Sequence, residues 1–575
     1  MNADLTAIAR AWRDADPDPE TANEIDRLLE ARDEAALEDR FRAELEFGTA
    51  GLRGLLGAGP NRMNRAVVRR ATAGVARHLL ATVPDAARRG VVLARDARRG
   101  SDSFALETAG VLAGHGIRVF SFVDRAPTPL GAFAVKELGA AAGVVVTASH
   151  NPPEYNGYKV YWENGAQIIP PFDAGIAGEI AKAGAANALP FLPRAEAEAR
   201  GLFVPLGEEM EERYHAAIAG LALHPGEGRD LGIVYTAMHG VGARFTLAAL
   251  ARAGFTSVHP VAAQNEPDGA FPTVAFPNPE EKGALDLSLA LCEETRADLL
   301  LANDPDADRL AAGARDRQGR MRVFSGNEIG VLLGAYCLKE RRPKPERPLV
   351  VTTIVSSSQL GKIARDLGAA SAETLTGFKW IENRALELER TEGRTTVFGY
   401  EEALGYSVGD VVRDKDGISA ALIFADLAGW CRARGVTAWD YLEEIQREHG
   451  LFLSAQRSVT IPGAEGAATI AAIMDGFRAR PPAAVGGLAV AETRDYRAGV
   501  PGLPKSNVVA YLLDGGSRVT LRPSGTEPKI KYYFELVEAP RAGEPIPSAI
   551  VRGEERLAAL VDDFVRLAVD RGQPA

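Results

Sequence analysis

Residues 143–160 read GVVVTASHNPPEYNGYKV, and the expectations for the rest of the chain are built outward from this stretch. Its first part, Val144 to Val146, is an apolar β-branched run, which predicts a buried strand. The run ends at residues 147–151, and the two prolines that follow prevent a helix from starting at once. Asn156-Gly157 is a turn signal, and an extended run resumes after it at 158–162.

The same stretch gathers three side chains that suit chemistry on an anion. We expect Ser149 and His150 on a stiff loop at a strand end, with Lys159 returning nearby. A hydroxyl, an imidazole and an ammonium placed together suit an activated serine that handles an anion. The alternative is a capped surface turn, and the other motifs of the chain have to decide between the two.

The composition is that of an ordinary globular protein with several domains. The chain has 575 residues, of which 46% are hydrophobic and 25% charged, and its net charge is −11. The acidic balance argues against nucleic acid or an anionic membrane as a partner, and no apolar run approaches the ~20 residues of a membrane span. The first residues show no signal peptide, and the cysteines at 292, 337 and 431 fit no metal or disulfide pattern, so we expect a cytoplasmic protein.

Three β-loop-α-β units recur along the chain, at about 90–122, 231–261 and 348–375. Such units favour parallel strands with right-handed crossovers and predict three related α/β domains. After about residue 450 the pattern changes to alternating strands and a closing helix, which predicts a smaller C-terminal α+β domain. We therefore predict an α/β protein with mixed, mainly parallel sheets around a central cleft, divided at 1–206, 207–322, 323–450 and 451–575.

A second motif, LLLANDPDADRL at residues 299–310, places three carboxylates at two-residue spacing after a buried strand. Asp304, Asp306 and Asp308 repel one another and stay ionised at modest cost only beside a cation, and all-oxygen ligands suit Mg²⁺. A calcium EF-hand is excluded because its sixth position would be Arg309 and its twelfth Arg315. The remaining alternative is a solvated acidic loop, but Arg309 directly after the triad indicates phosphate beside a metal.

Two Gly-containing motifs offer groups for phosphate. In FGTAGLRG at 47–54, glycines surround Arg53, which can grip a phosphate in a fork unless the segment is a plain turn. LRPSGTEP at 521–528 supplies Arg522, two hydroxyls and free backbone N–H groups around Gly525. That set can wrap a phosphate through charge-assisted bonds and a backbone nest, whereas the alternative is a hairpin turn.

A further motif, GYEEALG at 399–405, follows an apolar strand end. Glu401 and Glu402 can accept hydrogen bonds from sugar hydroxyls. The alternative is a helix N-terminus that is rich in Glu for reasons of the helix dipole. Upstream, Lys379 adds a cation beside aromatic residues.

Together these motifs supply a hydroxyl, a metal site, a polyol binder and a phosphate clamp, one from each predicted domain. At this point the chain resembles the α-D-phosphohexomutase family of phosphoglucomutases and phosphomannomutases, over nearly its whole length from Phe47. TASHNP at 147–152 and the Asp triad are highly specific for that family. FGTAGLRG, NDPDADR and YEEALGY are most similar to its longer, phosphoglucomutase 2-like branch.

The resemblance implies a mechanism through a phosphoserine at Ser149, with Mg²⁺ between that phosphate and the Asp triad, and with Ser149 itself counted among the metal ligands. The substrate's free hydroxyl attacks the phosphorus and gives a sugar 1,6-bisphosphate, which turns around and returns its other phosphate to Ser149. His150 or Lys159 is the candidate general acid/base. The other implied contacts are to the phosphoserine region (Arg53, Arg309), to the sugar (Lys379, Glu401, Glu402) and to the non-reacting phosphate (Arg522, Ser524, Gly525, Thr526).

The implied activity interconverts glucose 1-phosphate and glucose 6-phosphate, with a sugar 1,6-bisphosphate as activator and a monomer or homodimer as the working form. One departure matters, because many members carry Ser and His where this chain has Ala403 and Tyr406. Phosphomannomutase and phosphopentomutase activity therefore stay open, as does a sugar 1,6-bisphosphate synthase. An inactive sugar-phosphate sensor is the alternative from another functional class. The intact Ser149, triad and Arg522 loop argue against it, because a sensor need not retain the donor serine and the metal ligands.

Overall fold

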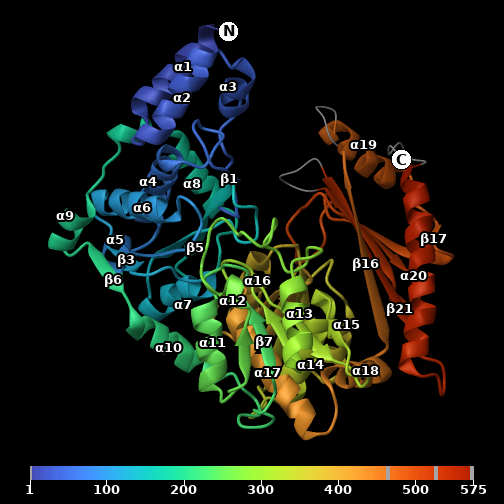
Figure 1. The fold of residues 1–575 in the computed structure, drawn as a ribbon. Helices are drawn as coiled ribbons and strands as arrows, with labels where there is room; N and C mark the ends of the chain where they lie inside the picture. Colours follow the sequence, from blue (N-terminus) through green and yellow to red (C-terminus); the bar gives the residue numbers. More distant parts are fainter. Residues whose placement is uncertain (1–2, 462–465, 524–528, 570–575) are drawn as a thin grey trace. The chain divides into compact units, whose positions relative to one another are not determined.

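The structure is a computed structural model in which residues 3–461, 466–523 and 529–569 are described. The chain divides into two compact units (Figure 1). The first unit comprises Met1–Phe324 and Ala403–Gly435, and the second comprises Ser325–Glu402 and Val436–Ala575. Within the described residues no helix combines the length and the apolar character that a membrane crossing requires.

The first sheet of the first unit contains the Ser149 stretch. Its six strands lie in the order β1-β5-β4-β2-β3-β6. The strands are β1 (Leu52–Leu55), β2 (Val91–Arg95), β3 (Val119–Phe122), β4 (Ala142–Val146), β5 (Tyr155–Trp162) and β6 (Phe203–Leu206). Strands β4, β2, β3 and β6 are parallel, whereas β5 pairs antiparallel with both β4 and β1. The chain therefore leaves β4 at its carboxyl end, forms the Ser149 loop and returns along β5.

Helices cover both faces of this sheet (Figure 1). Val144 and Val146 of β4 belong to a core with α4 (Arg65–Thr82), α6 (Ser101–Gly114) and α8 (Phe172–Ala181), and Val145 faces α7 (Thr128–Leu138) on the other side. All of β4 is buried, which explains its continuous apolar sequence. The remaining helices of this part are α1 (Ala3–Ala15), α2 (Pro19–Ala31), α3 (Glu34–Phe41), α5 (Ala86–Arg89), η1 (Ala186–Ala188) and α9 (Arg194–Ala199).

The second sheet of the first unit contains the Asp triad. Its order is β11-β10-β9-β7-β8, with β7 (Ile233–Thr236), β8 (Val258–Pro260), β9 (Leu299–Ala302), β10 (Ala311–Arg315) and β11 (Met321–Val323). Strands β7, β8 and β9 are parallel, and β9 turns back antiparallel into β10, so that the triad occupies the β9–β10 connection. The associated elements are α10 (Glu208–Ala219), α11 (Ala243–Arg252), α12 (Ala262–Asn265), α13 (Asp286–Thr295), β15 (Gly405–Val408) and α17 (Gly417–Ala433).

The second unit has a parallel part and an antiparallel part. In the parallel part, β12 (Pro348–Thr353) lies between β13 (Ala370–Thr374) and β14 (Thr395–Glu401), with α14 (Gly326–Glu340), α15 (Gln359–Asp366), α16 (Phe378–Glu392) and α18 (Ala438–His449). The antiparallel sheet has the order β16-β21-β20-β19-β18-β17. Its elements are β16 (Leu451–Thr460), α19 (Gly466–Ala479), β17 (Ala484–Val485), β18 (Leu488–Asp495), β19 (Val509–Leu513), η2 (Asp514–Gly516), β20 (Arg518–Pro523), β21 (Lys529–Glu538) and α20 (Ile546–Val569).

These sheets confirm the predicted α/β fold with a C-terminal α+β part. The three β-loop-α-β units lie where the sequence predicts them, at β2-α6-β3, β7-α11-β8 and β12-α15-β13. One local expectation differs from the structure. Gly51 approaches the backbone of Tyr158 on β5 so closely that any side chain would clash, and Arg53 lies on strand β1. This glycine therefore serves strand packing.

Candidate active site

The Ser149 loop is held in a strained backbone conformation. Ser149 has a φ of 53°, in the left-handed region that residues with a side chain rarely adopt. Its N–H donates to Thr147 Oγ1 at 2.8 Å, and its hydroxyl is almost fully buried. A strained residue of this kind persists only where the surroundings fix it, and such residues cluster at functional sites.

A buried arginine provides that fixation. The Arg98 guanidinium donates to the backbone carbonyls of Ser149 (2.5 Å), Asn151 (2.5 Å), Pro152 (2.9 Å) and Tyr155 (3.2 Å). It also forms an ion pair with Asp96 at 3.3 Å, and both side chains are buried. One planar cation therefore holds the loop through its carbonyl groups. The sequence analysis missed Arg98, whose only signal is a DxR pattern after a buried strand.

The structure brings Ser149 together with the Asp triad. Ser149 Oγ donates to Asp304 Oδ2 at 2.8 Å, and His150 Nδ1 lies 3.2 Å from the same hydroxyl. The triad residues offer oxygens that all lie within 4.8 Å of one another, and all three residues are buried. The β4–β5 loop and the β9–β10 loop thus form one polar centre within the first unit.

Lys159 and Thr128 both donate hydrogen bonds to carboxylate oxygens of the triad. Lys159 Nζ donates to Asp306 Oδ2 at 2.7 Å and to Asp308 Oδ2 at 2.8 Å. Thr128, at the start of α7, donates its N–H to the Asp306 carbonyl (3.0 Å) and its hydroxyl to Asp306 Oδ2 (2.7 Å). The N-terminus of α7 therefore adds a positive backbone dipole beside a carboxylate. Thr128 had no sequence signal as a site residue.

The charges and burial in the centre shift the pKa values of its titrating groups in different directions. Burial raises the pKa of Asp304, and the charges of Asp306 and Asp308 raise it further. Burial also opposes ionisation of Asp306 and Asp308, but it is outweighed by the combined charges and hydrogen bonds of their neighbours, among them Lys159, so the pKa of each of these two carboxyls is lowered. Burial and the cationic Arg309 hold the pKa of His150 well below its usual range, so its ring is neutral near pH 7.

The donor set fits a small divalent cation. Asp306 Oδ1 and Asp308 Oδ1 are buried and have no hydrogen-bond partner within residues 3–461, 466–523 and 529–569. Buried carboxylate oxygens are costly to leave without a partner. Each of these two carboxylates accepts its hydrogen bonds through Oδ2, while Asp308 Oδ1 lies 4.0 Å from Arg309 Nε in a long ion pair. An all-oxygen set of this kind suits Mg²⁺.

A segment from the later part of the chain completes the centre. Lys415 Nζ lies 3.1 Å from Asp308 Oδ2 and 3.3 Å from Asp414 Oδ1. The guanidinium of Arg309 is within 4.0 Å of Asp304 and Asp308, while its backbone N–H donates to Asp304 Oδ1 at 3.1 Å. The sequence analysis missed Lys415. The available signal was DKDG at 414–417, charged residues directly before an apolar helix.

Arg53 contacts the same loop from strand β1. Its guanidinium donates to Asn151 Oδ1 at 2.9 Å. The Arg53 side chain is exposed, and Arg309 and Arg98 lie close enough for their charges to act on it. Several cationic groups therefore surround the residues next to Ser149, which is an environment for a phosphate group.

The second unit gathers the other predicted site residues. The N–H of Gly377 donates to Glu401 Oε2 at 2.9 Å, and Ser356 Oγ donates to Glu402 Oε2 at 3.0 Å. Arg522 donates to Thr376 Oγ1, which adjoins Gly377. Lys379 lies in the first turn of α16. Ser524, Gly525 and Thr526 lie outside the described residues.

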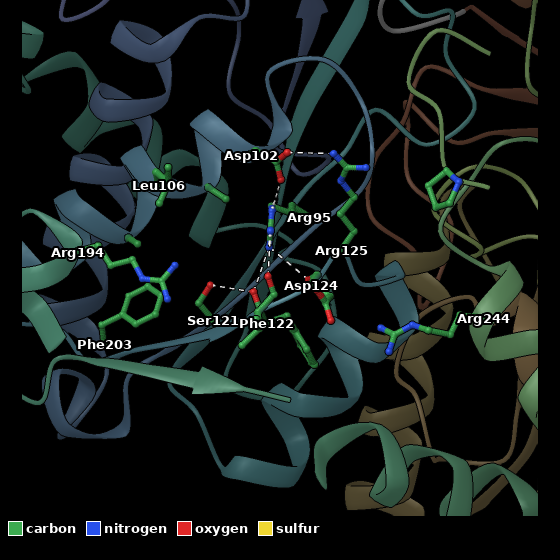
Figure 2. A pocket seen from close by; sticks show the side chains of 14 residues that line it. Arg95, Asp102, Leu106, Ser121, Phe122, Asp124, Arg125, Arg194, Phe203 and Arg244 are labelled. Carbon is green, nitrogen blue, oxygen red and sulfur yellow. Dashed lines mark hydrogen bonds and ion pairs between the residues drawn. The ribbon is translucent and has the colours of Figure 1, made fainter. Parts of the chain in front are cut away.

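A hollow of about 640 Å³ in the first unit is separate from this centre (Figure 2). Four arginines line it, and Figure 2 shows two of them, Arg95 and Arg125, reaching the same carboxylate, Asp102. The other two pair with Glu198 and Glu211. Because each arginine already has an acidic partner and neither Ser149 nor the triad lines the hollow, we assign no role in phosphoryl transfer to it.

Comparison with known proteins covers most of the chain. Four phosphoglucomutase/phosphomannomutase family models match in order: alpha/beta/alpha domain I at residues 44–187, domain II at 212–318, domain III at 325–448 and the C-terminal domain at 471–544. The chain is 42% identical over 510 residues to a Haemophilus influenzae protein named "Probable phosphomannomutase", covering 88% of this chain and 97% of the relative.

Two Homo sapiens relatives have different names. Phosphopentomutase is 36% identical over 579 residues, covering 95% of this chain and 93% of the relative. Glucose 1,6-bisphosphate synthase is 34% identical over 598 residues, covering 97% and 93%. With four matching domain models in order and these relatives along almost its full length, the chain belongs to the α-D-phosphohexomutase family and is an intramolecular phosphotransferase of the phosphoglucomutase/phosphomannomutase type.

Proposed function

We propose that this protein is a phospho-sugar mutase that moves a phosphoryl group between C1 and C6 of a hexose, interconverting glucose 1-phosphate and glucose 6-phosphate. One observation supports it above the others: Ser149 Oγ lies 2.8 Å from Asp304 in a buried triad whose free oxygens can hold a divalent cation. A hydroxyl in that position can carry a phosphoryl group that a neighbouring cation neutralises.

In the proposed cycle Ser149 starts phosphorylated and acts as the donor. A free hydroxyl of the sugar phosphate attacks the phosphorus, the bond from phosphorus to Ser149 Oγ breaks, and a sugar 1,6-bisphosphate forms. The intermediate then turns around, and the transfer runs in reverse with its other phosphate. A divalent cation held by Asp304, Asp306 and Asp308 would offset the charge on the transferring group. A sugar 1,6-bisphosphate would also prime unphosphorylated protein.

Of the two candidate proton carriers, the geometry favours His150. Its Nδ1 is 3.2 Å from Ser149 Oγ, and its low pKa leaves a neutral ring that can exchange a proton with that oxygen. Lys159 is bound to two carboxylates, which raise its pKa although burial opposes its charge. A lysine held charged in this way is suited to electrostatic stabilisation.

The groups of the second unit are proposed to bind the rest of the substrate. Glu401 and Glu402 would accept hydrogen bonds from sugar hydroxyls, and Lys379 would add a cation. The non-reacting phosphate would be held by Arg522 with Ser524, Gly525 and Thr526. In this proposal each predicted domain (1–206, 207–322, 323–450 and 451–575) contributes one motif.

A pentose phosphate is the second candidate substrate. The sugar loop has Ala403 and Tyr406 at positions where many members of the family have Ser and His, and the Tyr406 side chain is buried. A hydrogen bond to one hexose hydroxyl can therefore be missing. A relative named Phosphopentomutase also matches 95% of this chain. Mannose phosphates and sugar 1,6-bisphosphate synthesis are the remaining alternatives.

Coupled assays separate these candidates. Glucose 1-phosphate, mannose 1-phosphate and ribose 1-phosphate are compared by kcat/KM, each with and without the matching bisphosphate. We expect turnover of glucose 1-phosphate that rises when glucose 1,6-bisphosphate is added. A higher kcat/KM for ribose 1-phosphate would replace the hexose assignment by a pentose one. Release of bisphosphate as the main product would indicate a synthase, and no turnover of any of the three would refute the mutase proposal.

A further inference from the structure

We propose that Lys415 is a built-in counter-ion of the Asp triad, which lowers the affinity of the triad for a divalent cation. The inference rests on the proposed function, because it takes the triad as the metal site. It concerns a residue of the later segment 403–435, which packs on the triad within the first unit.

Lys415 competes directly for a metal-ligating carboxylate. Its Nζ lies 3.1 Å from Asp308 Oδ2, the oxygen that also accepts from Lys159 at 2.8 Å. Its side chain is only 13% exposed, so water screens this charge poorly. Lys415 lies between the carboxylates of Asp308 and Asp414 and therefore places a positive charge beside the metal site.

The fold fixes Lys415 in this position. Its second partner is Asp414, whose Oδ2 accepts from Tyr161 Oη at 2.6 Å and from Gln167 Nε2 at 2.9 Å. Tyr161 lies on β5, two residues after Lys159, so the strand that delivers the first lysine also anchors the second. Asp414 is buried, and its contacts leave the ammonium of Lys415 little freedom to swing away.

The residues that follow Lys415 attach the segment to the triad loop. Asp416 caps α17 by accepting from the N–H groups of Ile418 (3.0 Å) and Ser419 (3.1 Å), and its carboxylate also accepts from Tyr214 Oη at 2.9 Å. The Gly417 N–H donates to the Ala307 carbonyl at 3.2 Å, inside the triad loop. Lys415 is thus held from both sides of the chain.

The charge balance around the triad indicates what Lys415 does. Asp304, Asp306 and Asp308 contribute three negative charges, and Lys159, Lys415 and Arg309 each form an ion pair with at least one of them. The three cations equal the three triad carboxylates in number, although Lys415 shares its charge with Asp414 and Arg309 shares its charge with Glu280. Lys415 thus reduces the net negative charge that a divalent cation would meet at the triad, and a phosphate on Ser149 would add negative charge to the centre.

Two effects of Lys415 on metal binding have opposite signs. By binding Asp308 Oδ2 it keeps Oδ1 turned to the metal, and this orientation favours binding. As a cation 3.1 Å from a triad oxygen in a buried site, it would also repel a divalent ion held there. The repulsion is the larger effect, because the Coulomb energy between such charges at this separation exceeds the net contribution of one hydrogen bond. Lys159 also binds Asp308 Oδ2, so orientation is partly retained without Lys415.

The test measures metal binding and does not depend on turnover. Unphosphorylated full-length protein, checked by intact mass, is titrated with Mn²⁺ as the probe, and free Mn²⁺ is read by electron paramagnetic resonance. We expect Lys415→Met to lower the Kd for Mn²⁺ by at least about tenfold, because one repelling charge is removed. Lys415→Arg keeps the charge and should stay within about threefold of the natural protein.

Two comparisons make the result specific. Lys182→Met removes a lysine of the same unit that pairs with Glu179 at 2.8 Å on the surface, and it should leave the Kd unchanged. If Lys415→Met does not fold, as judged by circular dichroism, Lys415→Gln replaces it. This variant also removes the charge but keeps a polar side chain, and the same decrease in the Kd for Mn²⁺ is expected.

Each outcome decides between the possibilities. A Kd that is unchanged or raised in Lys415→Met would overturn the counter-ion proposal and would leave Lys415 as a structural contact, with the proposed function intact. Failure of the natural protein to bind Mn²⁺ at millimolar concentration would overturn the proposal together with the metal role of the triad.

Discussion

At the residue scale, the Ser149 loop depends on one buried guanidinium. Arg98 donates to four backbone carbonyls of residues 149–155, and Ser149 itself keeps a φ of 53°. Backbone carbonyls are present whatever the side chains of the loop are. The position of the reacting hydroxyl is therefore set by the geometry of a planar cation, which lysine does not reproduce.

We expect Arg98→Lys to lower kcat by about a hundredfold, since a misplacement of about 1 Å at a reacting group has effects of that size. Stability should fall by about 1–3 kcal/mol, because several buried carbonyls lose their donor. Coupled mutase assays and thermal unfolding measure the two effects. The neighbouring exposed Arg99→Lys is the matched control and should change neither. Full activity in Arg98→Lys would contradict the proposed clamp.

We expect Asp306→Asn to raise the Mg²⁺ concentration for half-maximal activity by at least about tenfold, because an anionic ligand with a buried free oxygen is lost. Transfer at saturating metal should also slow sharply. Activity is followed as a function of Mg²⁺ concentration, and the exposed Asp230→Asn of the same unit serves as the control. An unchanged metal titration would mean that the triad is only an acidic loop.

The residues that were predictable from the sequence are those with a local motif. Ser149 and the three aspartates lie in short strings that follow buried strands, and strand ends are where loops present reactive groups. Thr128 has no such string, and Arg98 and Lys415 have only short charged patterns that do not indicate a site by themselves. They reach the centre from a distant part of the chain, as Arg98 does from 51 residues before Ser149. Only tertiary packing reveals contacts of that kind.

At the scale of elements, the triad loop is shaped by its contact with the N-terminus of α17. A Cβ atom at Gly417 would lie far inside van der Waals distance of the Arg309 carbonyl and 2.6 Å from Asn303 Nδ2. Asn303 also donates to the Arg309 carbonyl at 2.7 Å, so this packing and the shape of the loop are coupled. The absence of a side chain at this position permits the approach.

Gly417→Ala should therefore destabilise the protein by about 1–3 kcal/mol, the usual cost of overpacking, and should also weaken metal binding by displacing the loop. Thermal unfolding and Mn²⁺ titration measure the two effects. Gly178→Ala on α8, where a Cβ meets nothing within 4 Å, is the control and should be neutral or slightly stabilising. Natural stability in Gly417→Ala would show that the contact is loose.

The contact between α10 and α11 makes the first unit sensitive to acid. His215 on α10 is buried, and its ring stacks on Phe245 of α11 at 6.1 Å between centroids. Burial lowers the pKa of His215, as do Arg252 and Arg244 of α11, while Glu212 raises it. The folded state thus binds fewer protons at this site than the unfolded state, and stability falls as pH drops below about 6.5.

His215→Phe should lose less thermal stability than the natural protein between about pH 7.5 and pH 5.5, because the stacked ring no longer titrates. Calorimetric scans of both proteins at the two pH values give the difference. The half-buried His224, whose Nδ1 lies 3.5 Å from Glu227, provides the control as His224→Gln. An equal loss in His215→Phe and natural protein would assign the acid sensitivity to other groups.

How well each strand could be predicted from the sequence depends on how deeply it is buried. The parallel strands β2, β4, β7, β9 and β12 are buried and mostly apolar, so their sequences predict them as strands. Strand β16 was not predicted. It is an edge strand whose residues are mostly half-buried or exposed, so its sequence lacks a clear apolar alternation.

At the scale of the whole molecule, the predicted site residues fall into two groups. Ser149, the triad and the cations around them belong to the first unit, and Glu401, Glu402, Lys379 and Arg522 belong to the second. The sequence could not show that residues 403–435 pack with the first unit, because β14, β15 and α17 follow one another as an ordinary α/β succession. The division between the units falls directly after Glu402, inside the motif predicted to bind the sugar.

The account as a whole depends on Ser149 as the residue that carries the phosphoryl group. Unphosphorylated protein is incubated with Mg²⁺ and with glucose 1,6-bisphosphate that carries an isotopic label in both phosphates. Its peptides are mapped by mass spectrometry, and the labelled protein is then chased with unlabelled glucose 1-phosphate. We predict one labelled phosphoryl group on Ser149 that passes to the sugar phosphate during the chase at the rate of turnover, while Ser149 stays phosphorylated with an unlabelled group from the substrate. Ser149→Ala should remain folded, with no label and almost no activity. A phosphoryl group on another residue, or more than a few per cent of natural activity in Ser149→Ala, would contradict the account.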